Sequence, residues 1–377
     1  MDSDLLFLRE ATRPHYEQGE PAVRVVDLFA GCGGLTVGLA EAARHFGFAL
    51  EIPLAVEFDE AIAGVFQTNF TKANVECQPV ESVIDGRLGE SLSTRESRLV
   101  NETGVVHWLH GGPPCQGHSD LNNHTRRRDR RNAFYLRMAR AAEILRPQVV
   151  VIENVPGVRH DKGGVVGKTR DYLDSLGYEV ADHVVALELL GVPQRRRRHA
   201  LIGLRGVDVD VDGVFDGLGG DTPQRDLSWA IGDLVGADCN ALDVPSQVSD
   251  VNVERIAWLQ AKPDRWNLPN SRRPVCHHGD HSYRSMYGKL AWNEPAQTIT
   301  SGFGSMGQGR YVHPSEPRTL TPHEAARIQF FPDWFDFTAG GFETHRSVWA
   351  KMIANAVPPK LTMELGRVLL PGLDLDG

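Results

Sequence analysis

A cysteine and a glutamate each follow an apolar run, and together they could modify an electron-poor ring. Cys115 comes after VVHWL in the stretch GGPPCQG, and Glu153 ends the apolar run VVVIE. The two prolines fix φ and remove two N–H donors, so the loop should hold the thiol rigidly at the end of a strand. A thiolate is a nucleophile, and a carboxyl on an adjacent strand end can donate a proton as charge builds on the ring. The pair is typical of covalent catalysis by a thiol.

Cys115 also has a simpler explanation, because a lone cysteine usually packs as a small hydrophobe. Glu153 weighs against this alternative, because an acid that closes a strongly apolar strand is costly to bury unless it is used. The remaining cysteines are scattered and form no CxxC pair: Cys32, Cys77, Cys239 and Cys276. This pattern predicts free thiols and argues against a disulfide framework or a zinc ribbon.

A second group of residues suits a cofactor that contains adenosine. In residues 27–39, DLFAGCGGLTVGL, a strand runs into glycines and then into a helix, which offers backbone N–H groups and open space to a ligand. The stretch lacks the GxGxxG spacing of a dinucleotide site and the GK[ST] ending of a phosphate loop. Glu57 ends the next strand, where an acid can hold two ribose hydroxyls, and Phe58 could stack on a base. A structural turn followed by a solvated glutamate is the alternative.

Arginines gather in two runs, although the net charge of the chain is −9. Residues 126–131 read RRRDRR and follow Cys115; either they contact phosphates or they form a solvated charged loop. Residues 195–198 read RRRR and precede an apolar strand, which favours a site over a nuclear-targeting patch or a solvated face. Residues 206–243 hold nine aspartates and a single arginine. The chain can therefore present one basic cleft and an acidic surface on its opposite side.

The elements that position these residues alternate between strand and helix. Strands are predicted over residues 23–29, 54–58, 105–110, 148–155, 178–187 and 198–204. Helices are predicted over residues 35–46, 61–70, 132–145 and 169–178. Because the strands are apolar throughout, we expect a parallel-type sheet covered by helices on both faces. Ligands bind at the carboxyl ends of the strands in such a fold.

This alternation stops near residue 205, and the chain is long enough for about two domains. We expect a catalytic and cofactor-binding domain over 23–205, after an N-terminal extension over 1–22. Residues 206–340, rich in Gly, Pro, Asp and aromatics, should form a smaller second domain. Helical periodicity returns in residues 321–331 and 345–370, and residues 341–377 are expected to return to the first domain.

Two features of the second domain leave alternatives open. The glycine-rich stretch 301–310, SGFGSMGQGR, fits either a close approach of backbone to a ligand or a long flexible turn. A metal cluster is conceivable among Cys276, His277, His278, Asp280 and His281. Adjacent residues of a strand point opposite ways and no second ligand pair follows, so a surface that reads the target is favoured over zinc.

In order and approximate spacing, the motifs resemble those of the C5-cytosine DNA methyltransferases. They are FAGCGG, Glu57, PPCQG, ENV, QRRRR, RTLTPHEAARIQFFPD and NAVPP, between residue 23 and about residue 370. The resemblance implies an α/β fold with the Rossmann-like, doubly wound sheet of class I methyltransferases, and a smaller target-recognition domain. It implies methyl transfer from S-adenosyl-L-methionine to C5 of a cytosine flipped out of double-stranded DNA, through a covalent bond between Cys115 and C6.

The same resemblance assigns roles to individual residues. Glu153 would contact N3 and the exocyclic amine of the base. Arg196 and Arg198 would lie beside it, with Arg196 the better candidate to contact the base and promote the Cys115 thiolate. The positions that match cofactor-lining residues are Phe29, Gly31, Gly33, Gly34, Glu57, Phe58, Glu81, Pro113 and Asn355. A loop that closes over the site would contact phosphates through Arg126, Arg127, Arg128, Arg130 and Arg131.

Two residues depart from the family pattern: His118 stands where an aromatic residue is usual, and Ala354 where glycine is usual.

The protein implied is a cytoplasmic, monomeric modification enzyme of bacterial type, with duplex DNA as substrate and a restriction endonuclease as functional partner. No stretch reaches the roughly 18 apolar residues of a membrane span. A tRNA cytosine-5 methyltransferase of the same fold and an inert DNA-binding relative remain as alternatives. The long middle segment favours duplex DNA, and Cys115, Glu153 and Arg196 together argue against an inert relative.

Overall fold

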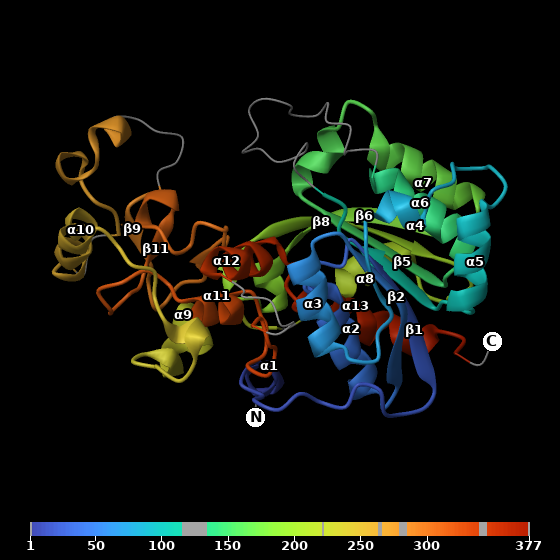
Figure 1. Ribbon diagram of the computed structural model, residues 1–377, viewed down its shortest axis with the longest axis horizontal. Coiled ribbons are helices and arrows are strands. Elements are labelled where there is room, and N and C mark those ends of the chain that lie inside the picture. The colour runs from blue at the N-terminus through green and yellow to red at the C-terminus, as the bar shows by residue number, and fades with distance from the viewer. Residues whose placement is uncertain are drawn as a thin grey trace.

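The computed structural model describes residues 2–114, 134–220, 222–262, 266–278, 285–338 and 345–375. Seven strands form one sheet in the order β3-β2-β1-β4-β5-β8-β6 (Figure 1). Their bounds are β1 Ala22–Leu28, β2 Ala49–Glu57, β3 Val75–Cys77, β4 Trp108–Gly111, β5 Val149–Asn154, β6 Glu179–Ala186 and β8 Arg197–Leu204. The sequence predicted each of these except β3, which has only three residues.

Strand direction departs from the expected parallel sheet at one place. Strands β1 to β5 pair in parallel, but β8 runs antiparallel to both β5 and β6. The connection from β6 to β8 covers residues 187–196, which is shorter than the dozen or more residues that a parallel crossover needs. The short connection therefore favours an antiparallel neighbour.

Successive side chains of the central strands enter two separate hydrophobic cores. Val149 and Val151 pack in the core that includes α2 (Gly34–His45) and α13 (Lys360–Leu369). Val150 and Ile152 pack in the other core, with α6 (Phe134–Leu145) and α7 (Val165–Ser175). Figure 1 shows these helix pairs on opposite faces of the sheet. Burial on both faces explains why β5 is apolar at each position from Val149 to Ile152.

Three shorter helices complete the first domain: α3 (Glu60–Asn69), α4 (Val80–Val83) and α5 (Thr94–Thr103). The sequence did not predict α5, which is poor in apolar residues. A capping box of Ser93 and Glu96 starts it, and the Arg140 guanidinium of α6 donates to the buried Glu96 at 2.6 Å. A cap and a buried ion pair thus fix a helix that has little apolar periodicity. None of the helices in the described ranges is long and apolar enough to cross a membrane.

Most of the segment predicted as a second domain lies beside the sheet (Figure 1), and it includes a small hydrophobic core of its own. It contains α9 (Leu227–Ile231), α10 (Asp250–Gln260), β9 (Gly288–Lys289), β10 (Ala296–Gln297) and β11 (Arg310–Val312). Its core residues are Ile256, Leu259, Leu268, Tyr287, Met306 and Val312. Helix α8 (Val211–Gly217) instead packs against β6 and β8. Part of the segment after residue 205 thus contacts the main sheet.

Several segments join the two domains. Strand β10 pairs with β7 (Gln194–Arg195), and α11 (Pro322–Ile328) contacts α12 (Arg346–Asn355). The N-terminal helix α1 (Ser3–Leu8) also contributes. Lys360 Nζ donates to both carboxylate oxygens of Asp4, at 2.7 and 2.8 Å, and Trp229 Nε1 donates to Asp2. The predicted extension is thus part of the junction.

The glycine-rich stretch 301–310 is tightly packed. Phe303 and Met306 are buried, and the Tyr311 hydroxyl accepts from the backbone N–H of Thr300 at 3.2 Å. A Cβ on Gly309 would come within 2.3 Å of the Gln297 side chain. Glycine is needed there because neighbouring groups approach closely, which argues against a long flexible turn.

Candidate active site at the carboxyl ends of the strands

The residues predicted to carry chemistry converge on one edge of the sheet. The glycine-rich turn follows β1, Glu57 ends β2, the GGPP segment follows β4, and Glu153 lies at the end of β5. These four strands are parallel, so their carboxyl ends share one edge. The sheet topology alone brings together groups that are more than 100 residues apart in sequence.

Cys115 lies outside the described residues, but the chain that leads to it is placed. The Pro113 carbonyl accepts from Asn154 Nδ2 at 3.2 Å. A Cβ built on Gly112 would lie 3.1 Å from Glu153 Oε2. Strand β5 therefore contacts the segment two and three residues before Cys115. His118 and the predicted phosphate contacts also lie outside the described residues: Arg126, Arg127, Arg128, Arg130 and Arg131.

Glu153 is a buried acid with an arginine partner. Its side chain is 6% exposed, and Arg198 Nε lies 2.7 Å from Oε1. Burial raises the pKa of Glu153 above its ordinary value, although the charges of Arg198 and Arg196 lower it. A carboxyl whose pKa is raised keeps its proton closer to neutral pH, so Glu153 is suited to donate a proton or a hydrogen bond.

Arg196 occupies a different position from Arg198. It is 2% exposed, and its guanidinium donates to the carbonyls of Ala354 at 3.1 Å and Ala356 at 3.0 Å. These bonds connect the start of β8 to the end of α12. Among the described residues, the hydrogen-bonded partner of Glu153 is Arg198, so the geometry favours Arg198 beside the acid. That Arg196 contacts the base stays a prediction.

Glycine is favoured in the turn after β1 for two reasons: positive φ angles and a close approach of neighbouring backbone. Phe29, Gly31 and Gly33 have positive φ values of 58°, 56° and 98°, a region that glycine adopts without strain. A Cβ on Gly34 would lie 2.3 Å from the Val357 carbonyl oxygen. A Cβ on Gly31 would meet nothing within 4 Å. The turn therefore packs against the C-terminal NAVPP segment through Gly34 and leaves open space beside Gly31.

Glu57 borders that open space. It is buried, and its two carboxylate oxygens accept from the backbone N–H groups of Gly31 and Asp59, each at 2.9 Å. Burial raises the pKa of Glu57, although those backbone N–H groups lower it. Each oxygen keeps a lone pair for a further donor. The adjacent Phe58 is 65% exposed, which leaves its ring available to a flat ligand group.

The remaining predicted cofactor positions lie around the same edge. Asn355 is the exposed last residue of α12, and Lys351 on that helix donates to Asp59 at 2.7 Å. Helix α12 therefore reaches the loop that follows Glu57. Pro113 is buried, and Glu81 is half-buried in α4, shortly after β3.

The described cysteines do not compete with Cys115 for the role of nucleophile. Cys32, Cys77, Cys239 and Cys276 are all free thiols, as predicted. Cys32 belongs to the glycine-rich turn, but burial raises the pKa of its thiol to about 12. Its thiolate is therefore negligible at neutral pH. The other three are exposed and belong to other parts of the chain.

One set of potential metal ligands occurs in the described ranges, and it does not include Cys276. It consists of His313, Glu316 and Glu324. The Arg318 guanidinium contacts both of these carboxylates, and His313 Nδ1 accepts from two backbone N–H groups. Protein groups thus pair both carboxylates, whereas His313 Nε2 has no hydrogen-bond partner among the described residues. Asp280 and His281 of the predicted cluster lie outside the described residues.

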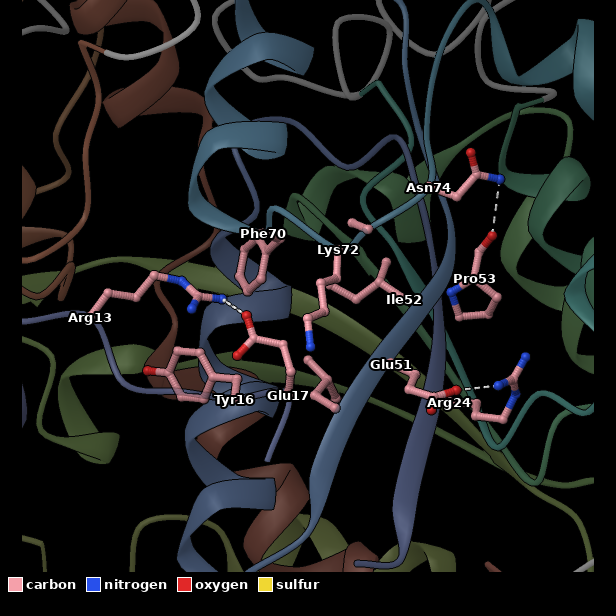
Figure 2. Close-up of a pocket in the computed structure, with 12 residues that line it drawn as sticks. Arg13, Tyr16, Glu17, Arg24, Glu51, Ile52, Pro53, Phe70, Lys72 and Asn74 are labelled. Carbon is pink, nitrogen blue, oxygen red and sulfur yellow. Dashed lines mark hydrogen bonds and ion pairs between the residues drawn. The ribbon is translucent and has the colours of Figure 1, made fainter. Parts of the chain in front are cut away.

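Figure 2 shows a separate pocket at the amino-terminal half of β2. Its volume is about 330 Å³, and its lining includes Leu50, Ile52 and Lys72. Both of its acids are paired, Glu17 with Arg13 and Glu51 with Arg24. Glu57 lies at the opposite end of the same strand, so this pocket is distinct from the candidate active site.

Comparisons with known proteins agree with this arrangement. Residues 23–370 match the family model of the C-5 cytosine-specific DNA methylases. A type II methyltransferase, M1.BsuMI of Bacillus subtilis, is 41% identical over 95% of this chain and 83% of its own length. The type II methylase M.HgiDII of Herpetosiphon aurantiacus is 28% identical over 92% and 93%. A prophage-encoded DNA modification methyltransferase of E. coli has a TM-score of 0.64 at 23% identity, over 92% of this chain and 97% of its own, which shows the fold. The chain therefore belongs to the C-5 cytosine-specific DNA methylase family and is a DNA (cytosine-5) methyltransferase with the class I fold, which implies S-adenosylmethionine as its cofactor.

Proposed function

We propose that Cys115, Glu153 and Arg198 methylate C5 of a cytosine that has been flipped out of duplex DNA. The observation that carries this proposal is the position of the Glu153 carboxyl, bound by Arg198 and packed against Gly112. Gly112 precedes Cys115 by three residues in the sequence, so we expect the nucleophile to lie near the acid. A base inside a duplex cannot enter such a space, and the enzyme must extrude it.

The chemistry follows from these three side chains. The Cys115 thiolate forms a bond to C6 and pushes the electrons of the C5–C6 double bond toward C5. Protonated Glu153 donates to N3 and so neutralises charge that builds on the ring, while Arg198 holds the carboxyl in place. When bound, S-adenosylmethionine supplies an electrophilic methyl group within reach of C5. Loss of the C5 proton to water or hydroxide and cleavage of the S–C6 bond restore the aromatic ring and the thiolate.

The residues around Glu57 fit S-adenosylmethionine. The open space beside Gly31 can accept the methionine part, the spare lone pairs of Glu57 can accept from ribose hydroxyls, and the exposed Phe58 ring can stack on adenine. We assign the remaining cofactor contacts to Phe29, Gly33, Gly34, Glu81, Pro113 and Asn355.

We further infer that the arginines at 126–131 contact DNA phosphates and close over the flipped base, and that the second domain reads the target sequence. The relatives named type II methyltransferases support a modification enzyme whose functional partner is a restriction endonuclease. We expect the enzyme to act as a monomer.

Transfer of a labelled methyl group tests the activity. Duplex DNA should accept the label and tRNA should not, and bisulfite sequencing of host DNA after expression should reveal a single sequence context. Label on tRNA alone would replace the DNA assignment with the tRNA alternative. Label on neither, with cofactor bound, would favour an inert DNA-binding relative.

Duplex DNA with 5-fluorocytosine in the target tests the covalent step, because fluorine at C5 leaves no proton to remove. The enzyme should form a covalent complex that survives denaturation. Cys115→Ser should abolish this complex, whereas Cys239→Ser, which removes an exposed thiol of the second domain, should retain it. A complex that persists in the Cys115→Ser variant would exclude Cys115 as the nucleophile.

A further inference from the structure

A cluster of three buried polar side chains lies beneath the turn that follows β1. The Thr36 hydroxyl donates to Asp27 Oδ2 at 2.6 Å, and His110 Nε2 lies 3.1 Å from the same oxygen. His110 Nε2 also lies 3.2 Å from Thr36 Oγ1. The exposed fractions are 1% for Asp27 and 0% for both Thr36 and His110. Thr36 donates the hydrogen bond that a carboxylate buried this deeply needs, and His110 Nε2 completes the cluster through its contacts with both Asp27 Oδ2 and Thr36 Oγ1.

The cluster joins three elements that border the proposed active site. Asp27 lies on β1, two residues before Phe29, and His110 lies on β4, five residues before Cys115. The two residues are direct partners in the parallel pairing of these strands. Thr36 belongs to the first turn of α2, two residues after Gly34. The cluster therefore links the cofactor turn to the strand that leads to the nucleophile.

Each member of the cluster has few other partners. Asp27 Oδ1 and His110 Nδ1 are buried and have no hydrogen-bond partner among the described residues. Removal of either side chain would thus leave the other with Thr36 as its one side-chain partner among the described residues. The backbone ladder already pairs β1 with β4 in register, so strand pairing does not require the cluster. Two residues earlier on the same strands, the apolar side chains of Val25 and Trp108 pack in the hydrophobic core.

We propose that His110 and Asp27 are positioning residues for methyl transfer, which hold the cofactor turn and the GGPP segment at a fixed separation. This proposal rests on the proposed function of Cys115. Neither side chain touches the reacting atoms; each acts through the loop that follows it. A displacement of about 1 Å between reacting groups can lower a rate about 100-fold, so fixing this separation matters for catalysis.

Two substitutions of His110 test the proposal. His110→Leu removes the donor, whereas the side-chain amide of His110→Gln can replace the N–H at the Nε2 position. In labelled-methyl transfer to duplex DNA at saturating cofactor, His110→Leu should lower kcat about 10- to 100-fold, the range that misplacement of reacting groups produces. The rate of 5-fluorocytosine trapping should fall in parallel, and His110→Gln should restore most of both rates.

His107 provides a matched control. It is also a buried histidine, it lies just before the other end of β4, and its Nδ1 accepts from the backbone N–H of Arg24. His107→Leu should lower Tm as His110→Leu does but leave kcat per folded molecule unchanged. Equal kcat losses in the two variants, or no kcat loss in His110→Leu, would overturn the positioning role.

Thr36→Val is a second route if His110→Leu does not fold, because valine keeps the shape of threonine without its hydroxyl. It should lower kcat several-fold and raise KM for S-adenosylmethionine, since Thr36 lies on the cofactor side of the cluster. Unchanged values of both would overturn the proposal. An inactive wild-type enzyme, or trapping that survives Cys115→Ser, would instead contradict the proposed function.

Discussion

Arg198 and Glu153 form an ion pair across neighbouring antiparallel strands, with Nε 2.7 Å from Oε1. Glu153 lies opposite Ala200 in the pairing of β5 with β8, so Arg198 lies two residues nearer the start of β8. A parallel β8 would have begun at the other edge of the sheet, far from the end of β5. The reversal of one strand therefore brings the RRRR run to the carboxyl ends of the parallel strands.

The first prediction concerns Glu153→Gln. Glutamine keeps the size of the side chain but cannot supply an acidic proton, so kcat should fall about 10²- to 10⁴-fold, the usual contribution of a general acid. Labelled-methyl transfer measures this loss. Because burial raises the pKa of Glu153, wild-type kcat/KM should decline as pH rises through that value, when the carboxyl loses its proton. The variant should lack this descending limb. A variant with wild-type kcat would exclude Glu153 from the chemistry.

The second prediction separates the two arginines. Arg198→Ala should lower kcat strongly and Tm little, because Arg198 is the ion-pair partner of Glu153 at the site. Arg196→Ala should mainly lower stability, because the carbonyls of Ala354 and Ala356 would lose a buried donor. Gln329 Nε2 also donates to both carbonyls, at 3.3 Å, so each keeps one donor, and the cost is about 1.5–3 kcal/mol for each lost hydrogen bond from the charged guanidinium. Thermal unfolding and methyl-transfer kinetics of both variants measure the losses in Tm and in kcat. The reverse pattern would favour Arg196 as the residue that contacts the base.

The fold was largely predictable from sequence because its strands are buried on both faces. Apolar runs such as VVVIE carry a clear signal, and the sequence predicted six of the seven strands of the main sheet. Strand β3 and helix α5 have weak patterns: one is too short, and the other depends on a cap and on the Arg140–Glu96 pair. Tertiary contacts define such elements, and local sequence does not reveal them.

The sequence predicted which residues form the site, but not which of them contact one another. Motif order and strand ends placed Glu57 and Glu153 on the same edge. The sequence favoured Arg196 over Arg198, but only packing determines which arginine pairs with Glu153, and that partner is Arg198. It also gave no signal for the Asp27–His110 contact, since register between strands 83 residues apart is set by the sheet. Gly34 was predicted as a cofactor residue, and its contact with Val357 became evident only in the structure.

The third prediction uses that contact. Gly34→Ala would place a Cβ 2.3 Å from the Val357 carbonyl oxygen, so the NAVPP segment must shift. Tm should fall, and the Kd for S-adenosylmethionine should rise at least several-fold, because the segment carries Asn355. Calorimetric titration measures the binding. Gly167→Ala is the control: it lies in α7, where a Cβ meets nothing within 4 Å, so it should stabilise the helix by up to about 1 kcal/mol. Unchanged binding by the Gly34 variant would show that the C-terminal segment does not support the cofactor site.

The fourth prediction concerns His323, which bridges two carboxylates. Its Nδ1 lies 2.7 Å from Asp243 Oδ1 and its Nε2 lies 3.0 Å from Asp333 Oδ1. Each ring nitrogen needs a hydrogen to face a carboxylate, so the bridge requires the imidazolium. Burial lowers the pKa of His323, but the hydrogen bonds to Asp333 and Asp243 outweigh it and raise the pKa above its ordinary value.

The sign of the pH effect follows from this raised pKa. The stabilisation by the bridge is fully present below about pH 6.5, the ordinary value for histidine, and it is lost as pH rises through the folded-state pKa. His323→Gln should therefore lower Tm most near pH 6, and the difference from wild type should shrink at pH 8 to 9. Thermal unfolding of both proteins across this range measures the difference. A Tm difference that stays constant with pH would mean that His323 contributes only as a neutral hydrogen-bonding group, and the imidazolium bridge between the second domain and α11 would be excluded.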